Sequence, residues 1–103
     1  MKQQPKRTAI IQEWLESERG WGQRPDGCSV HLSREDLGTY VEEYWASMPK
    51  EVPSEYSRPC GDAYLAQVDV HTYKQLRKNN KQEKYGLRLW ELEFRKLQKK
   101  WEQ

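Results

Sequence analysis

The segment from Ser33 to Pro49 has the most regular apolar spacing in the sequence and constrains the fold more than any other. Its apolar side chains recur at i, i+3, i+4, i+7, i+8 and i+11: Leu37, Tyr40, Val41, Tyr44, Trp45 and Met48. This spacing places them on one face of an α-helix. Ser33 is a favourable N-cap, and Glu35 and Asp36 suit the positive end of the helix dipole. Because Pro49 ends the pattern, we predict a helix over 34–48 with its aromatic face in the core.

A tight turn is predicted at Arg24-Pro25-Asp26-Gly27, within the stretch GWGQRPDGCSVHL. Proline presets φ at the second turn position, and glycine accepts the positive φ that lets a strand resume. The sequence therefore predicts a β-hairpin over 20–32. A similar pentapeptide, RPCGD, occurs at 58–62, but two five-residue turn motifs do not make a repeat.

The remaining N-terminal segments are assigned by spacing and composition. Apolar groups at Ile10, Ile11, Trp14 and Leu15 have helical spacing and precede Gly20, which predicts a helix near 8–19. Residues 49–62 contain three prolines, which predicts an irregular loop. We expect residues 1–7 to be flexible.

The C-terminal third alternates between strand and helix patterns. Residues 64–70 alternate as a half-buried strand, and Thr72 is a candidate cap for a short helix. The stretch 85–90 is predicted as a strand that passes into a terminal helix. An apolar seam with steps of three and four residues runs through this segment: Leu87, Trp90, Phe94, Leu97 and Trp101.

These elements predict one α+β domain over residues 1–103, with a small, largely antiparallel sheet and helices near 8–19, 34–48 and the C-terminus. The alternative is a mostly helical protein with a long C-terminal helix. Aliphatic residues are few, but the five Trp and six Tyr supply apolar area for a core. No signal peptide or continuous apolar run is visible, so we expect a cytoplasmic protein without a membrane segment or a structural disulfide.

Two cysteines and two histidines are the candidates for metal or nucleophile chemistry: Cys28, His31, Cys60 and His71. The second pair is too widely separated for a zinc knuckle. On a regular strand, Cys28 and His31 point to opposite faces, so one metal ion cannot bind both. We predict no metal site and no cofactor, with Cys28 a buried thiol and His31 a surface imidazole.

Catalysis is not favoured by any motif in the chain. Cys60, Gly61-Asp62 and His71 can be drawn as nucleophile, turn and base, but nothing in the sequence requires it. No Gly-x-Ser-x-Gly, Gly-rich phosphate loop or His-Glu-x-x-His is present. We therefore predict a protein that is not an enzyme and has no catalytic residues.

Charge is distributed unevenly although the net charge is only +2. Acidic side chains dominate 35–69, and basic ones dominate 71–103. Basic groups meet phosphates, and aromatic rings stack on bases, so segment 73–90 is a candidate nucleic-acid surface. Its candidate residues are Tyr73, Lys74, Arg77, Lys78, Lys81, Lys84 and Arg88.

Surplus aromatic residues and the uneven charge favour a different leading hypothesis, a small non-enzymatic interaction protein. It would act as a regulator, inhibitor or assembly adaptor of a larger complex, compatible in size with the regulators that mobile elements and phages encode. We expect a protein partner, with nucleic acid as the alternative and no membrane. The candidate contact residues are Tyr85, Arg88, Trp90, Phe94 and Trp101. The terminal seam would pack on the partner, on a second copy in a homodimer, or in the protein's own core.

Overall fold

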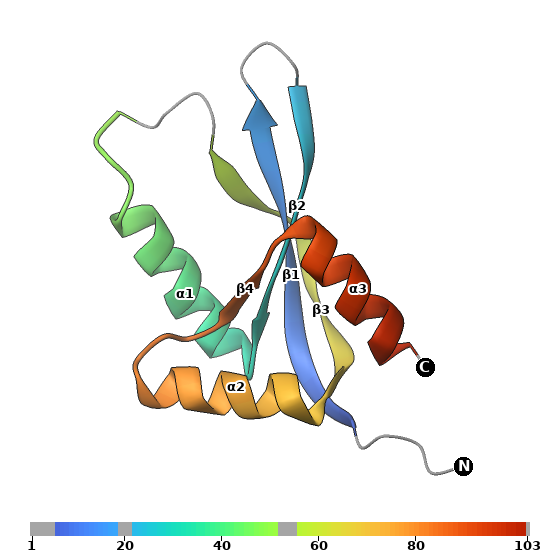
Figure 1. Ribbon diagram of the computed structural model, residues 1–103. Helices are drawn as coiled ribbons and strands as arrows, with labels where there is room; N and C mark the ends of the chain where they lie inside the picture. The colour runs from blue at the N-terminus through green and yellow to red at the C-terminus, as the bar shows by residue number, and fades with distance from the viewer. Residues whose placement is uncertain (1–5, 19–21, 52–55, 103) are drawn as a thin grey trace.

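Four antiparallel strands form one sheet, in the order β3-β1-β2-β4, in the computed structural model. The structure describes residues 6–18, 22–51 and 56–102. In chain order the elements are β1 (Lys6–Glu18), β2 (Gly22–His31), α1 (Arg34–Ala46), β3 (Ser57–Asp69), α2 (Val70–Lys81), β4 (Leu87–Leu89) and α3 (Glu91–Trp101). Figure 1 shows α3 crossing in front of the strands and α2 lying across one end of the sheet. The predicted α+β class is confirmed, and the mostly helical alternative is wrong.

β1 lies where we predicted a helix near 8–19, so that prediction is wrong. The strand pairs with β2 on one side and β3 on the other. Ile11 joins the core beneath α3, whereas Trp14 contacts α1 on the opposite face. Because helices cover both faces of this central strand, apolar residues appear on both, and the alternation typical of a half-exposed strand is lost. The resulting spacing imitates a helix.

β2 is a single strand, so the hairpin predicted within 20–32 is also wrong; residues 20 and 21 lie outside the described part of the chain. The hairpin is formed by β1 and β2 instead. The expected turn at 24–27 is an irregularity inside β2, where Asp26 and Gly27 together lie opposite Trp14. Gly27 has the positive φ that we expected, 80°. This is the geometry of a β-bulge.

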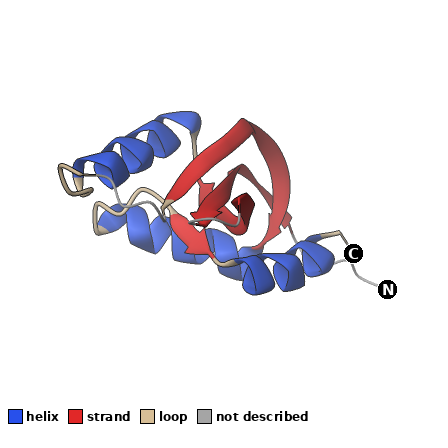
Figure 2. Ribbon diagram, turned by 90° about the horizontal axis from the view of Figure 1, so that it is seen from above, coloured by secondary structure: helices blue, strands red, loops and turns tan. Residues whose placement is uncertain are grey.

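β3 contains the second irregularity, in the look-alike pentapeptide. Its pairing with β1 shifts between Ile11 and Glu13, and Gly61 has a φ of 71°. The side chain of Gln12 fills the gap, since its Nε2 donates to the carbonyls of Cys60 at 3.0 Å and Gly61 at 3.1 Å. Bulges bend strands and increase their twist. In Figure 2 the sheet is strongly curled.

Two further expectations are corrected by these strand bounds. The irregular loop predicted over 49–62 ends where β3 begins at Ser57, and residues 52–55 lie outside the described part. The strand predicted over 64–70 is thus the second half of a longer one. Of residues 1–7, expected to be flexible, Lys6 and Arg7 belong to β1 and pair with β3, whereas 1–5 lie outside the described part.

α1 confirms the predicted helix, although it ends at Ala46 rather than at 48. The Ser33 hydroxyl accepts a hydrogen bond from the Asp36 backbone N–H at 3.1 Å, as expected for an N-cap. The aromatic face of α1 contacts the sheet through edge-on ring pairs of Trp14 with Tyr40 and Tyr44. No residue of α1 is fully buried, so the expectation that this face lies in the core is wrong, and Trp45 is 40% exposed.

The C-terminal elements follow the predicted order of strand and terminal helix, with β4 shorter than the predicted 85–90. α2 begins after Asp69, which is its N-cap in place of Thr72. The Asp69 carboxylate accepts hydrogen bonds from the Thr72 hydroxyl and from Trp101 Nε1, the latter at 2.9 Å. Trp101 is therefore fastened to the start of α2, which explains how an indole so near the described end of the chain is held in place.

The apolar core lies between the sheet and the helices α2 and α3. Its buried members are Ala9, Ile11, Cys28, Val30, Val68, Leu76, Leu89, Phe94 and Trp101. Within the described residues, no helix has the length and apolar content needed to cross a membrane.

Candidate functional site

A buried chain of hydrogen bonds lies on the α1 side of the sheet. Trp14 Nε1 donates to Ser29 Oγ at 2.8 Å, and Ser29 Oγ lies 2.7 Å from His31 Nε2. His31 Nδ1 lies 2.7 Å from the Tyr85 carbonyl oxygen. Since a carbonyl only accepts, Nδ1 carries the proton, and Nε2 accepts the proton of the Ser29 hydroxyl. The polar side-chain atoms of Trp14, Ser29 and His31 all have hydrogen-bond partners, and these bonds fix the plane of the Trp14 ring.

The Ser29–His31 pair resembles half of a nucleophile site, but it is sealed from substrate. Both residues are completely buried, so the expectation of a surface imidazole at His31 is wrong. Burial lowers the pKa of His31, opposed by the Tyr85 carbonyl and by Asp36, and the ring is neutral. This pair holds Trp14 in place and offers no reactive group to a ligand.

Cys28 lies on the opposite face of β2, within the core under α3, so the predicted opposition of Cys28 and His31 is confirmed. Burial raises the pKa of the Cys28 thiol to about 12, which keeps it protonated and unreactive at neutral pH. Cys28 and Cys60 pair with Glu13 from the two sides of β1, and both are free thiols. Two strand spacings separate them by about 9.5 Å, too far for a disulfide.

Arg88 lies between two indole rings on the α1 side of the sheet. Its guanidinium carbon is 4.5 Å from the centre of the Trp14 ring and 4.8 Å from that of Trp90. Its Nη2 pairs with the Asp26 carboxylate at 3.0 Å and donates to the Asp26 carbonyl at 2.7 Å. The bulge at Asp26 aims both oxygens at Arg88. Burial lowers the pKa of Arg88, opposed by Asp26, and the group remains charged.

A cavity of about 410 Å³ opens beside this cation. We call it the aromatic cavity; it is lined by Trp14, Tyr40, Tyr44, Ser57, Arg88 and Trp90. The Tyr44 hydroxyl donates to the Ser57 carbonyl, and the Ser57 hydroxyl donates to Asp26. Its volume lies in the range of ligand sites, and its walls combine aromatic rings with a few placed polar groups.

Aromatic surface continues beyond the aromatic cavity along the end of α1. The centre of the Trp45 ring lies 5.2 Å from the centre of the Tyr44 ring and 6.2 Å from that of the Tyr56 ring, and both contacts are edge-on. Trp90 is 59% exposed and Trp45 40% exposed. The two indoles thus extend the lining of the cavity outward to solvent.

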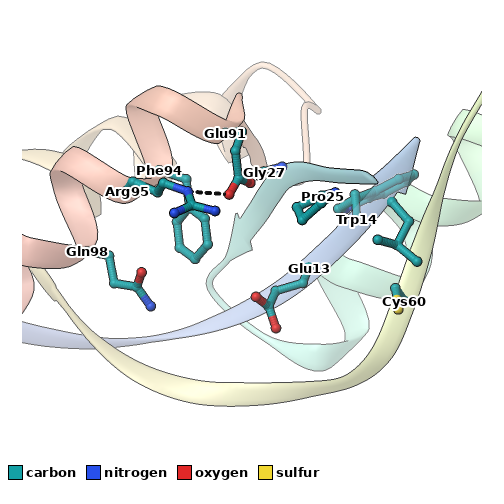
Figure 3. A pocket seen from close by; sticks show the side chains of 10 residues that line it. Glu13, Trp14, Pro25, Gly27, Cys60, Glu91, Phe94, Arg95 and Gln98 are labelled. Carbon is teal, nitrogen blue, oxygen red and sulfur yellow. Dashed lines mark hydrogen bonds and ion pairs between the residues drawn. The ribbon is translucent and has the colours of Figure 1, made fainter. Parts of the chain in front are cut away.

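A second cavity, of about 380 Å³, lies under α3 and between the two bulges. Figure 3 shows Glu91 paired with Arg95 above it and Glu13 entering from β1. Glu91 also accepts from the Gly27 backbone N–H at 2.9 Å, so its charge is already used within the protein. Among the described residues, no three His, Cys, Asp or Glu side chains are grouped to hold a metal ion.

A third feature is the exposed side of α2. A shallow depression of about 290 Å³ is lined, among the described residues, by four cations that we call the basic face of α2: Lys74, Arg77, Lys78 and Lys81. Lys84 is exposed in the segment after the helix. Tyr73 packs against the core instead of interleaving with the cations, and Arg88 is engaged by Asp26. Of the residues predicted to bind nucleic acid, the four cations on α2 therefore lie together, whereas Tyr73 and Arg88 do not belong to that face.

The predicted partner-binding residues are likewise divided. Arg88 and Trp90 meet at the aromatic cavity, whereas Phe94 and Trp101 are buried in the protein's own core. Tyr85 is half-buried and contributes its carbonyl to His31. The sequence pattern does not indicate Trp14, Asp26 and Ser57 as site residues, and it predicts Tyr40 and Tyr44 in the core. The helical spacing of the two tyrosines shows that they share a face, but not that their side of the sheet holds a cavity.

Comparison with protein-family models, with curated proteins and with solved structures found no match.

Proposed function

We propose that this protein is a non-enzymatic binding protein that captures a protein partner at the aromatic cavity. The observation that supports this most directly is Trp90, which stacks on Arg88 at the cavity and leaves 59% of its surface in solvent. Tryptophan and tyrosine beside a pocket are the residues that dominate binding energy in interfaces. A capture protein of this kind would serve as a regulator, inhibitor or assembly adaptor.

The aromatic cavity is held in shape before any partner arrives. Trp14 is fixed by Ser29 and His31, and Arg88 is fixed by Asp26 and by the two indole rings. Binding at such a site orders few side chains, so little of the interaction energy is lost to conformational entropy.

A polypeptide fits this surface better than a small molecule. A small ligand within the cavity would not reach Trp45, which extends the aromatic surface past Tyr44. α1, which forms one wall, carries more acidic than basic side chains: Glu35, Asp36, Glu42 and Glu43 against Arg34. We infer a partner segment with an apolar or aromatic side chain for the cavity and basic residues beside it, since opposite charge steers association.

Peptide display against the whole protein tests this proposal. We expect a library of random peptides to yield binders with an apolar residue flanked by Lys or Arg. Trp90→Ala should weaken these binders at least about tenfold, which is the effect of losing a hot-spot residue. The matched control is Leu92→Ala, because Leu92 is also exposed, at 77%, but does not line the cavity.

Two results would overturn the proposal. One is a selection that enriches no peptide over an empty-surface control. The other is a set of binders that Trp90→Ala and Leu92→Ala weaken equally. For the comparison of variants, circular dichroism should show that Trp90→Ala and Leu92→Ala are both folded. Both side chains are mostly in solvent, so their loss leaves the core intact.

A further inference from the structure

The basic face of α2 is a row of like charges on one side of a helix. Its cations recur at i, i+3, i+4 and i+7, and the row extends about 10 Å along the axis. Among the described residues, none of its members takes part in an ion pair: the pairs are those of Arg24, Arg88, Arg95 and Lys100. In the described part of the chain, no acidic side chain lines the depression between them.

The helix dipole does not account for all four of these cations. Lys78 and Lys81 lie in the last turn, where positive charge favours the helix dipole. Lys74 and Arg77 lie too early in the helix for that benefit. Each also faces a like charge four residues later, and like charges at this spacing destabilise a helix. An external anion would remove that repulsion.

We propose that the basic face of α2 binds the phosphate backbone of a nucleic acid without reading its sequence. Cations in a row neutralise successive phosphates and release their counterions. Base stacking has no platform on this face, because Tyr73 is packed against the core. Direct sequence readout therefore has no support here, and binding rests on charge alone.

An anionic membrane fits this face less well than a nucleic acid. Helices that lie in a membrane surface bury an apolar side among the lipids. The apolar side of α2 is already used, since Leu76 is completely buried and Tyr73 packs on the same core. The four cations of this face are exposed to solvent, where they suit phosphates in water.

The experiment is fluorescence anisotropy of the whole protein with a labelled 20-base-pair DNA duplex and with a labelled 20-nucleotide single strand. We expect log K to fall linearly with log salt, with a slope of up to about −3.6 for the duplex and about −2.8 for the single strand if all the cations make contact. The double substitution Arg77→Gln with Lys78→Gln should reduce the duplex slope by about 1.8.

The matched control is Lys96→Gln with Lys99→Gln, which removes the same charge from exposed positions on α3. It should leave the slope unchanged. An equal loss in both double variants would show only the effect of net charge and would overturn the proposal. So would the absence of DNA binding at low salt, whether or not vesicles containing phosphatidylserine bind. Peptide capture through Trp90 is independent of these outcomes, because Arg88 and the aromatic cavity do not belong to this face.

Discussion

The two faces of the sheet are built from the same strands but held together by different forces. In β2, Cys28 and Val30 enter an apolar core under α3, whereas Ser29 and His31 join a hydrogen-bonded network beside α1. All four side chains are fully buried. The core residues of the α3 face are held by apolar packing, which leaves them little freedom, although a cavity of about 380 Å³ also lies under α3. The α1 face fixes its rings by directional hydrogen bonds and keeps a cavity next to them.

This difference separates stability from binding. Apolar burial is proportional to area and has no direction, so we expect the buried cluster under α3 to contribute strongly to the free energy of folding. Hydrogen bonds contribute little net stability but define orientation. The α1 face therefore sets the position of Trp14 and Arg88, to which the exposed Trp90 is added. Substitutions on the two faces should differ in size and in what they affect.

The largest effect is expected where the two faces share a backbone, at Gly27. A Cβ at this position would lie 1.9 Å from the Leu89 carbonyl oxygen, and its φ is 80°. Gly27→Ala should push β4 away from β2 and lower the free energy of unfolding by more than about 4 kcal/mol, measured by urea denaturation. Gly61→Ala is the control, because Gly61 has a similar φ and a Cβ there would meet no atom of the described residues within 4 Å. It should cost about 1–2 kcal/mol, and equal losses would contradict the steric argument.

Phe94→Ala measures the apolar face directly. Phe94 is only 4% exposed and packs beside Trp101 in the core. Its truncation should lower the free energy of unfolding by about 3–5 kcal/mol. On the α1 side, Trp45→Ala should cost only about 1 kcal/mol, because that ring is partly exposed and has edge-on partners alone. Urea denaturation measures both variants. Equal decreases in the free energy of unfolding would contradict the view that the α3 face contributes more to stability than the α1 face.

Ser29→Ala breaks the polar face at its centre. It leaves Trp14 Nε1 and His31 Nε2 without the hydroxyl that they share. Unsatisfied buried groups cost about 1–3 kcal/mol. We also expect the Trp90-dependent peptide binders to weaken, since Trp14 loses its orientation. A variant that binds normally would show that the network is not needed to shape the cavity.

The smallest effect is a dependence of stability on pH that belongs to the polar face. Burial lowers the pKa of His31 in the folded protein, despite the Tyr85 carbonyl and Asp36. An unfolded histidine takes up a proton near pH 6.5, so below that pH the unfolded state binds more protons. Stability contributed by neutral His31 is full above about pH 6.5 and is lost as pH falls through the folded pKa. Melting temperatures at pH 7.5 and 5.5 should show a decline that is smaller in His31→Gln.

Local chemistry predicted several features of this fold well. Ser33 caps α1, the aromatic residues of that helix share a face, and a strand leads into the terminal helix. The glycine of the RPDGC pentapeptide has the positive φ that its turn chemistry demands. These outcomes depend on residues close together in the chain, whose preferences act whatever surrounds them.

Features that depend on residues far apart in the sequence could not be predicted in this way. Whether Ile10, Ile11, Trp14 and Leu15 form a helix or a strand depends on there being a helix on each side of the sheet, which no local pattern records. The two look-alike pentapeptides became bulges because β1 runs between the strands that contain them. The aromatic cavity is also a product of this arrangement, since its lining comes from four separate elements and from Trp90, which lies between β4 and α3.

The sequence by itself determined the α1 helix with its Ser33 cap, the positive φ of Gly27 and the spacing of the cations on α2. The tertiary structure alone decided which aromatic residues were left for a partner: it buried Phe94 and Trp101, exposed Trp90, and placed Arg88 between two indoles. The physical reason is that backbone preferences act over a few residues, whereas burial and charge pairing depend on neighbours that only the folded sheet brings together.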